Sequence, residues 1–384
     1  MFLSDGELEE VTGFRRALHR RPELSGAEAE TARAVEFALK ETEADEIVTG
    51  LGGQGVAAIY RGTSEGPTVM IRAELDGLPI EEISDLPHRS EIAGKGHLCG
   101  HDGHMAILLA LGVGLGRQRP QRGRVILLFQ PAEENGAGAA AMIADPKFAA
   151  LKPDFAFSLH NFPGLPLGHV ALTEGPVNCA SRGMKIGLSG KTAHASSPED
   201  GIAPTFAVAK LLKGLTALGG GGALTEDFTL VTVTHARLGE PTFGISPGYA
   251  EVWATLRTLT DGRMATLVAD AEALVRKEAE AAQLELTISY EDVFHHCSNA
   301  GSAVSELRRA LDDEGVSHDH GADALPMKAS EDFGLFGRVA PSAMFFLGAG
   351  ESHPRLHNPD YDFPDALIGI GARIFMRAIR NLVG

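Results

Sequence analysis

The chain has 384 residues, 44% of them hydrophobic and 22% charged, a composition typical of a globular protein with two or three domains. Its formal net charge of −17 excludes nucleic acid and anionic membranes as expected partners, and no apolar run is long enough to span a membrane. The three cysteines are an odd number and the first residues do not resemble a signal peptide, so we expect a reducing, cytoplasmic setting.

The first part of the chain alternates between helical and extended patterns. In chain order, the predicted elements are helices at 8–19 and 27–40, strands at 54–61 and 68–74, a helix from 107, a strand at 125–129, a helix at 137–143 and a strand at 155–159. The near-continuously apolar strands are typical of strands buried on both faces. This alternation predicts an α/β domain with a mixed, largely parallel core and helices on both faces.

The pattern changes near residue 180. The elements expected there are a strand at 184–188, a helix at 203–218, strands at 228–235 and 250–258, a helix at 264–281 and a strand at 284–290. This order, β-α-β-β-α-β, is the ferredoxin-like arrangement, and it predicts an inserted domain at 181–292. Residues 1–180 and 293–384 would then form the other domain, completed by a helix at 300–314, a strand at 343–347 and a helix at 366–382.

Polar side chains stand where the predicted parallel strands end. Glu74 and Asp76 follow one strand, Glu133 and Glu134 follow another, and His160 ends a third. Active residues of open α/β sheets gather at the carboxyl ends of the strands. We therefore expect these side chains to share one site.

Residues 97–105 read His-Leu-Cys-Gly-His-Asp-Gly-His-Met and precede the apolar run that predicts a buried helix. The thiolate of Cys99 and the imidazole of His101 are ligands that zinc-like ions prefer, and the two glycines allow near neighbours to converge on one point. The alternative is a surface histidine cluster beside a buried cysteine.

Glu133 and Glu134 are costly to ionise side by side unless cations neutralise them. A pair of this kind at a strand end indicates a metal, with one carboxylate as ligand and the other facing the substrate; a solvated turn is the alternative. A histidine such as His160 at the end of an apolar strand is also compatible with a hydrogen-bonded core residue. His357 is unremarkable by itself.

Together these residues supply soft and hard ligands for two metal ions. The ligand candidates are Cys99, His101, Glu134, His160 and His357. Sites with two metals hold their ions ~3.5–4 Å apart and activate a bridging water. Glu133 would be the general base that accepts a proton from that water.

The chain resembles the family of zinc-type metallopeptidases and amidohydrolases that includes hippurate hydrolases, N-acyl-amino-acid amidohydrolases, aminoacylases, carboxypeptidase G and auxin-conjugate hydrolases. It is most similar to the amidohydrolase branch. The motifs occur in the family's order along nearly the whole chain: His19-Arg-Arg-Pro-Glu-Leu-Ser, Arg72-Ala-Glu-Leu-Asp-Gly-Leu-Pro-Ile, Cys99-Gly-His-Asp-Gly-His, Phe129-Gln-Pro-Ala-Glu-Glu, Gly190-Lys-Thr-Ala-His-Ala-Ser-Ser-Pro, Ser330-Glu-Asp-Phe and Leu356-His-Asn-Pro-Asp-Tyr-Asp-Phe.

The resemblance implies a role for each matching position. It places the metal ligands at the five ligand candidates and the general base at Glu133. It implies that Asp76 orients a ligand from behind the metals and that His194 stabilises the oxyanion, often in the site of a partner subunit. It also implies that the inserted domain is a ferredoxin-like lid that makes a homodimer contact.

The chain departs from the family's pattern at several positions. The branch usually has Asp-x-Asp where this chain has Glu74 and Asp76, and many relatives have an Asn near the substrate where this chain has Phe243 and Gly244. Substrate contacts in the inserted domain are therefore less defined than the metal site. Arg257 is a candidate carboxylate clamp because its guanidinium matches a carboxylate, or else a surface arginine on a strand.

These observations lead us to expect a dinuclear metal-dependent amidohydrolase that acts on N-acyl amino acids or related small amides. Zinc is the expected metal because one ligand is a thiolate, with manganese, nickel and cobalt as alternatives. A dipeptidase, carboxypeptidase or N-carbamoyl amidohydrolase would fit the same scaffold. A binding protein that kept the fold is the alternative from another class, although it would not need Glu133.

Overall fold

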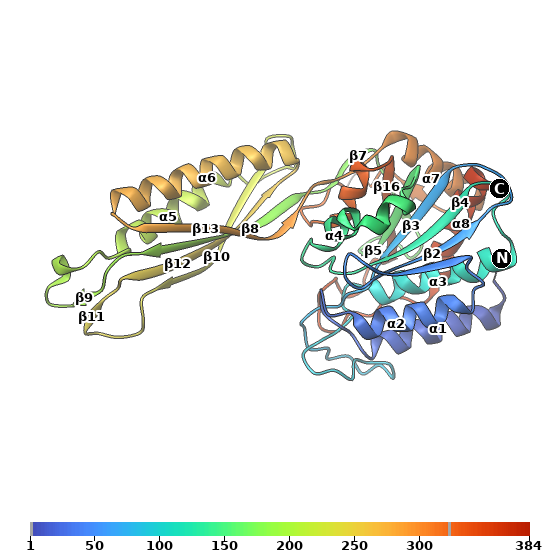
Figure 1. Ribbon diagram of the computed structural model, residues 1–384, viewed down its shortest axis with the longest axis horizontal. Coiled ribbons are helices and arrows are strands. Elements are labelled where there is room, and N and C mark those ends of the chain that lie inside the picture. Colours follow the sequence, from blue (N-terminus) through green and yellow to red (C-terminus); the bar gives the residue numbers. More distant parts are fainter. Residues whose placement is uncertain (1–2, 322–323) are drawn as a thin grey trace. The chain divides into compact units, whose positions relative to one another are not determined.

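The computed structural model describes residues 3–321 and 324–384, which divide into two compact units (Figure 1). The first unit consists of residues up to 177, 297–325 and 332–384, and the second of residues 178–296 and 326–331. The short segment 326–331 belongs to the second unit because the Cys179 N–H donates to the carbonyls of Met327 and Ala329, at 3.2 and 3.0 Å.

A mixed sheet forms the centre of the first unit. Its eight strands, among the described residues, lie in the order β1-β2-β4-β3-β5-β16-β6-β15. Strands β4, β3, β5 and β16 run parallel, whereas β1 and β2 pair antiparallel at one edge. The strand bounds are Glu46–Leu51 (β1), Gly55–Arg61 (β2), Thr68–Glu74 (β3), Arg124–Gln130 (β4), Phe155–Pro163 (β5), Val170–Ala171 (β6), His318–Asp319 (β15) and Ser342–Gly350 (β16).

Helices cover both faces of this sheet, as predicted (Figure 1). One face, with Val56, Ile71 and Val125, shares a hydrophobic core with α1 (Asp5–His19), α2 (Ala29–Lys40), α3 (His101–Arg117), α7 (Gly301–Glu314) and α8 (Ala366–Val383). The other face presents buried Met70 and Ile126. On that side lies α4 (Gly138–Ala144). The 3-10 helix η3 (Asp332–Arg338) lies there too, since its Phe333 ring faces Arg72 of β3, and Phe148 of η1 (Pro146–Leu151) packs on Phe336.

Burial explains why the sequence pattern located the central strands. Every residue of β3 is buried, and so is every residue of β4 after Arg124. A strand covered on both faces needs apolar side chains at successive positions, not at alternate ones. The predicted strand at 155–159 was too short, because β16 stays paired with β5 as far as Pro163.

The sheet opens near the carboxyl end of β5. Strand β3 pairs with β5 only as far as Arg72 and Ser158, while β16 follows β5 beyond that point on the other side. The N–H of Asn161 therefore donates to His104 on α3 at 3.2 Å, and not to a neighbouring strand. This opening brings the first turn of α3 against the end of β5.

The second unit contains a four-stranded antiparallel sheet in the order β10-β12-β8-β13, counted over the described residues. The strands are β8 (Ala180–Ser189), β10 (Thr229–Leu238), β12 (Tyr249–Thr258) and β13 (Glu285–Phe294), with helices α5 (Thr205–Leu218) and α6 (Asp261–Ala281) between them. The two helices and the sheet share one hydrophobic core. The predicted strand-helix-strand-strand-helix-strand order is confirmed.

Short strands outside the main sheets were not predicted. Strands β9 (Ala193–His194) and β11 (Ile245–Ser246) pair with each other in the second unit, and β7 (Gly175–Asn178) pairs with β14 (Cys297–Asn299). A 3-10 turn, η2 (Pro198–Asp200), follows β9. Strands of two to four residues contain too few positions for a periodic pattern, and only long-range pairing defines them.

Two global properties can be read from the described residues. No helix there combines the length and the hydropathy that a bilayer span requires. Cys99, Cys179 and Cys297 are all buried.

Candidate metal centre

A sharp turn at the start of α3 places Cys99 and His101 side by side. Gly100 is the N-cap of the helix and has φ +90°, in the left-handed region that favours glycine. A Cβ atom on Gly100 would collide with the amide nitrogen of Asn161. Both Cys99 and His101 are buried. The turn therefore directs a thiol and an imidazole, two residues apart, toward the carboxyl end of β5.

The structure brings together the donor atoms of all five ligand candidates in three overlapping groups, each with atoms within 4.8 Å of one another. The first group is Cys99, His101 and His160, in which Cys99 Sγ lies 3.4 Å from His160 Nε2. The other two groups are Cys99 with Glu134 and His357, and His101 with Glu133 and Glu134.

His101 has a defined orientation. Its Nδ1–H donates to the carbonyl oxygen of Asp76 at 2.8 Å, which leaves Nε2 facing Glu133 and Glu134 at 3.9 and 3.8 Å. Burial lowers the pKa of His101, but the side-chain carboxylate of Asp76 and the other nearby carboxylates outweigh burial and raise that pKa to about 10. The space beside Nε2 therefore favours positive charge.

The Cys99 thiol agrees with that reading, whereas the His160 imidazole is held neutral. Burial, with Glu134 and Glu133 adding to it, raises the pKa of the Cys99 thiol well above its usual range. Burial and the nearby His104 lower the pKa of His160 to about 3, so that imidazole is neutral. A buried thiol, imidazoles and adjacent carboxylates converge on one point, and this donor set fits a divalent ion of borderline softness.

Asp76 is completely buried and connects two of the ligand candidates. Its Oδ2 accepts the backbone N–H of Glu134 at 3.0 Å and the hydroxyl of Ser25 at 2.7 Å. The backbone carbonyl of Asp76 accepts the Nδ1–H of His101. One residue therefore orients the His101 ring and fixes the backbone of the Glu133–Glu134 pair, at the position where the resemblance implied an orienting acid.

The backbone before Glu133 is in an unusual conformation. Ala132 has φ +53°, in the left-handed region that residues with a Cβ rarely adopt. Its N–H donates at 2.8 Å to the Glu28 carboxylate, which is buried and also accepts from Gly26. This turn directs Glu133, which is buried, toward Nε2 of His101. Glu28 was not identified from the sequence, because nothing near it in the chain indicates the contact.

His104 is a second buried residue that sequence reasoning left unassigned. Its Nδ1 lies 2.7 Å from Glu74 Oε2, and its Nε2 accepts two N–H groups of Asn161. Its ring packs edge-on against that of His160, with centroids 4.9 Å apart. Both ring nitrogens of His104 are engaged by protein groups, so this histidine supports the donor cluster.

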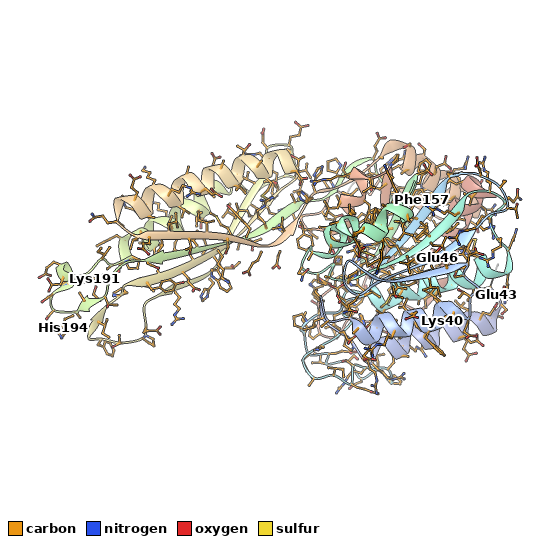
Figure 2. The ribbon with its side chains drawn as sticks, viewed as in Figure 1. Lys40, Glu43, Glu46, Phe157, Lys191 and His194 are labelled. Carbon is orange, nitrogen blue, oxygen red and sulfur yellow. The ribbon has the colours of Figure 1, made fainter. Side chains whose placement is uncertain are left out.

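The remaining two predicted site residues, His194 and Arg257, belong to the second unit. His194 is exposed on β9, and Figure 2 shows it at the end of that unit with Lys191. The Ser196 N–H donates to His194 Nδ1 at 3.2 Å, so the neutral imidazole carries its proton on Nε2. Arg257 Nη1 donates to the Lys328 carbonyl and to Ser330 Oγ, at 2.6 and 2.8 Å.

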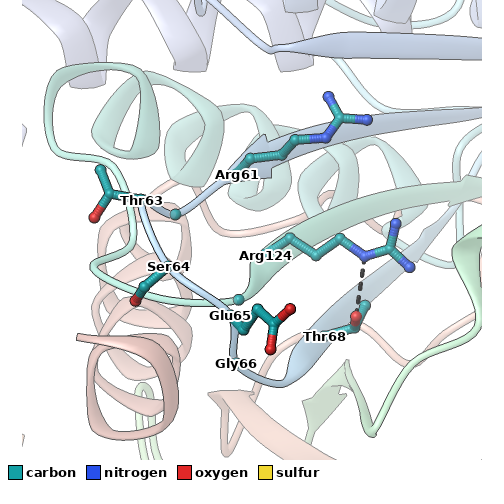
Figure 3. Close-up of a pocket in the computed structure, with 9 residues that line it drawn as sticks. Arg61, Thr63, Ser64, Glu65, Gly66, Thr68 and Arg124 are labelled. Carbon is teal, nitrogen blue, oxygen red and sulfur yellow. Dashed lines mark hydrogen bonds between the residues drawn. The ribbon is translucent and has the colours of Figure 1, made fainter.

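A surface hollow beside the loop from β2 to β3 lies at the opposite end of the first unit's sheet (Figure 3). It includes Thr68 and Arg124, the first residues of β3 and β4. Each strand is seven residues long, so roughly 20 Å separates this hollow from Glu74. Arg124 Nε donates to Thr68 at 3.0 Å, and Arg61 forms an ion pair with Glu46. Both arginine side chains of this hollow therefore already pair with groups of the protein.

Comparisons with known proteins agree with these features. The model of peptidase family M20/M25/M40 matches residues 70–381. An N-acetyl-L-cysteine deacetylase of Bacillus subtilis is 32% identical over 362 residues, which cover 94% of this chain and 85% of that protein. A hippurate hydrolase of Campylobacter jejuni is 30% identical over 376 residues, with 97% and 95% covered.

A solved structure agrees with the sequence comparisons. The crystal structure of a Bacillus subtilis protein, named as a dinuclear metal binding peptidase from the M20 family, has a TM-score of 0.82 and 25% sequence identity. The match covers 99% of each chain. The chain therefore belongs to peptidase family M20/M25/M40, and it is a hydrolase of the amidohydrolase type.

Proposed function

We propose that the protein is a metal-dependent amidohydrolase that cleaves the amide bond of N-acyl amino acids or related small amides. The observation that carries the proposal is the convergence of Cys99, His101, Glu134, His160 and His357 around Glu133 at the open end of the sheet. The relatives named as N-acetyl-L-cysteine deacetylase and hippurate hydrolase support the substrate class.

In this proposal the five ligand candidates hold two divalent ions, with zinc first because Cys99 is a soft ligand. The bound ions would supply an activated water and polarise the amide carbonyl. His160 is neutral, and the hydrogen bond from Nδ1 of His101 to the Asp76 carbonyl leaves Nε2 as the nitrogen that would face a cation. The Cys99 thiol would lose its proton to solvent when a cation occupies the site.

Glu133 moves the proton. Its carboxylate accepts a proton from the attacking water, whose oxygen forms the new bond to the amide carbon. When the carbon–nitrogen bond breaks, Glu133 returns that proton to the leaving amine. The turn at Ala132, held by Glu28, keeps the carboxylate beside His101 and therefore beside the reacting atoms.

His194 donates to the oxyanion in this scheme. The hydrogen bond from Ser196 leaves Nε2–H as the donor, which is the form that stabilises a developing negative charge. Asp76 orients His101 and Glu134. Arg257 remains the candidate clamp for a substrate carboxylate, because a guanidinium has five N–H donors and the two contacts given above use Nη1.

We also propose a homodimer formed through the second unit. Strand β10 lies at an edge of its sheet, and its residues from His235 to Leu238 are exposed. An exposed edge presents unpaired N–H and C=O groups that can pair with another strand. Large apolar side chains of the same unit are exposed too, among them Phe206, Phe243 and Ile245.

A substrate panel tests the reaction. N-acetyl and N-benzoyl amino acids, dipeptides and N-carbamoyl amino acids would be incubated with chelated protein and with protein given back zinc, manganese, nickel or cobalt. We expect turnover only after metal is restored, and mainly on the N-acyl amino acids. Turnover confined to dipeptides or N-carbamoyl compounds would assign another reaction to the scaffold, and turnover by fully chelated protein would contradict the mechanism.

Glu133→Gln is the sharpest single substitution. Because an amide cannot accept the proton, we expect kcat to fall by about 10²–10⁴-fold while the metal content stays unchanged. Glu134→Gln is the matched control, and it should lower the metal content as well. Wild-type turnover by Glu133→Gln would remove Glu133 from the role of general base.

A further inference from the structure

We propose that Asn161 is a positioning residue that fixes the spacing of the segments that carry the metal ligands. This inference rests on the proposed function, because it concerns the same site. Asn161 lies on β5 directly after His160, and its side chain is completely buried. Every contact that carries the inference lies within the first unit.

The side chain of Asn161 joins three segments that are distant in sequence. Its Nδ2 donates to the Cys99 carbonyl at 2.7 Å and to His104 Nε2 at 3.1 Å, and its Oδ1 accepts the hydroxyl of Tyr361. Cys99 is a ligand candidate, His104 stands one turn after His101, and Tyr361 follows His357 by four residues. One amide therefore contacts the ligand segments on either side of His160.

Each polar atom of the amide faces a partner of the opposite hydrogen-bonding kind. Nδ2 has two hydrogens, and it faces a carbonyl oxygen and an imidazole nitrogen that both accept. Oδ1 faces a hydroxyl donor. The backbone N–H of Asn161 also donates to His104 Nε2, which leaves Nδ1–H of His104 to donate to the Glu74 carboxylate. No other side chain of similar size offers two donors and an acceptor in this geometry.

The neighbouring backbone is shaped around this amide. Gly100, between Cys99 and His101, has no room for a Cβ because the Asn161 amide and the Tyr361 hydroxyl occupy that space. The segment that carries His357 is held from the other side, since the His357 N–H donates to the Leu98 carbonyl at 2.8 Å. Asn161 therefore sets how closely the Cys99 turn approaches β5 and the 357–361 segment.

Asn161→Asp is the direct test, because it keeps the size of the side chain and replaces the two donors with a carboxylate oxygen. Asn299→Asp is the matched control. Asn299 is buried in the same unit, and its side-chain amide forms hydrogen bonds with the backbone of Thr173 and Met344. Zinc affinity would be measured by competition with a chelator, thermal stability by calorimetry, and the thiolate-to-metal band of the cobalt-loaded proteins by absorption.

We expect Asn161→Asp to weaken metal affinity by about 10- to 100-fold and to shift the cobalt–thiolate band. Asn299→Asp should lower the melting temperature without either effect. Metal affinity and a cobalt spectrum equal to the wild type in Asn161→Asp would overturn the proposal, whatever its melting temperature. If that variant cannot be purified folded, Tyr361→Phe takes its place, with an expected loss of about 2- to 10-fold in affinity, and an unchanged affinity there overturns the proposal.

The same measurements separate this inference from the proposed function. Wild-type protein that binds no metal would contradict the metal-dependent reaction itself. Wild-type protein that binds metal and hydrolyses its substrate, together with an Asn161→Asp variant that binds metal equally well, would contradict the role of Asn161 alone.

Discussion

His19 is completely buried on α1 beside acidic side chains. Its Nδ1 lies 2.9 Å from Asp102 and its Nε2 lies 3.3 Å from Glu82. Burial lowers the pKa of His19, but Asp102 and Glu82 outweigh burial and raise that pKa to about 10. Asp102 follows His101 directly, so this pair also anchors the first turn of α3.

The raised pKa predicts how stability depends on pH. In the unfolded chain His19 titrates near its ordinary pKa of about 6.5. The stabilisation from protonated His19 is therefore fully present below pH 6.5 and is lost as the pH rises toward 10. We expect the free energy of unfolding to fall across this range by up to ~1.4 kcal/mol per pH unit from this residue.

Urea unfolding of the wild type and of His19→Gln at several pH values between 6.5 and 8.5 measures this term. The difference in unfolding free energy between the two proteins should shrink as the pH rises. His235→Gln, an exposed histidine of the second unit, is the control and should follow the wild type. A difference between wild type and His19→Gln that is independent of pH would show that His19 is not protonated in the folded state.

Among the elements, α3 depends most on close packing. It contains several glycines, which lower helix propensity, yet nearly all its residues up to Leu115 are buried. A Cβ on Gly103 would collide with the ring of Phe363, and one on Gly112 would lie 2.8 Å from the Tyr60 hydroxyl. These glycines let α3 approach its neighbours closely, and tertiary contacts compensate for the weak propensity.

Gly103→Ala should therefore destabilise the protein, by about 1–3 kcal/mol or more, because Phe363 must move to admit the methyl group. Gly13→Ala on α1 is the matched control, since no atom lies within 4 Å of its Cβ position. There the better helix former should stabilise by about 0.5–1 kcal/mol. Denaturant unfolding measures both, and equal effects at the two positions would refute the packing argument.

At the scale of the whole molecule, the proposed reaction uses residues from both units. His194 is exposed, so His194→Ala should leave the metal content and the melting temperature unchanged. Turnover should fall by about 10²–10³-fold because an oxyanion donor is lost. Metal loss in this variant would contradict its assignment to the oxyanion.

Mixing two inactive variants tests whether His194 acts across the proposed dimer. In a mixed dimer of His194→Ala and Glu133→Gln, one of the two sites has an intact Glu133 and receives an intact His194 from the other subunit. After subunit exchange we expect roughly a quarter of the wild-type activity. If exchange is demonstrated and no activity returns, His194 does not act in the site of the other subunit.

The family, the fold class and the amidohydrolase type were all predicted from the sequence, and all are confirmed. The roles of the individual site residues stay predictions, although the structure brings Cys99, His101, Glu133, Glu134, His160 and His357 together. These features were readable because donor chemistry and buried-strand patterns are properties of short stretches. A buried strand or a ligand motif can be recognised from fewer than ten neighbouring residues.

Only the tertiary structure decided which residues support the site. Asn161, His104 and Glu28 contact segments tens to hundreds of positions away, and no nearby residue in the sequence indicates those partners. The left-handed backbone at Ala132 likewise cannot be read from the sequence, because alanine rarely adopts that conformation. The chemistry of short stretches identifies the ligand candidates. Buried polar groups, however, need hydrogen-bond partners, and those pairs form only when segments distant in sequence pack together.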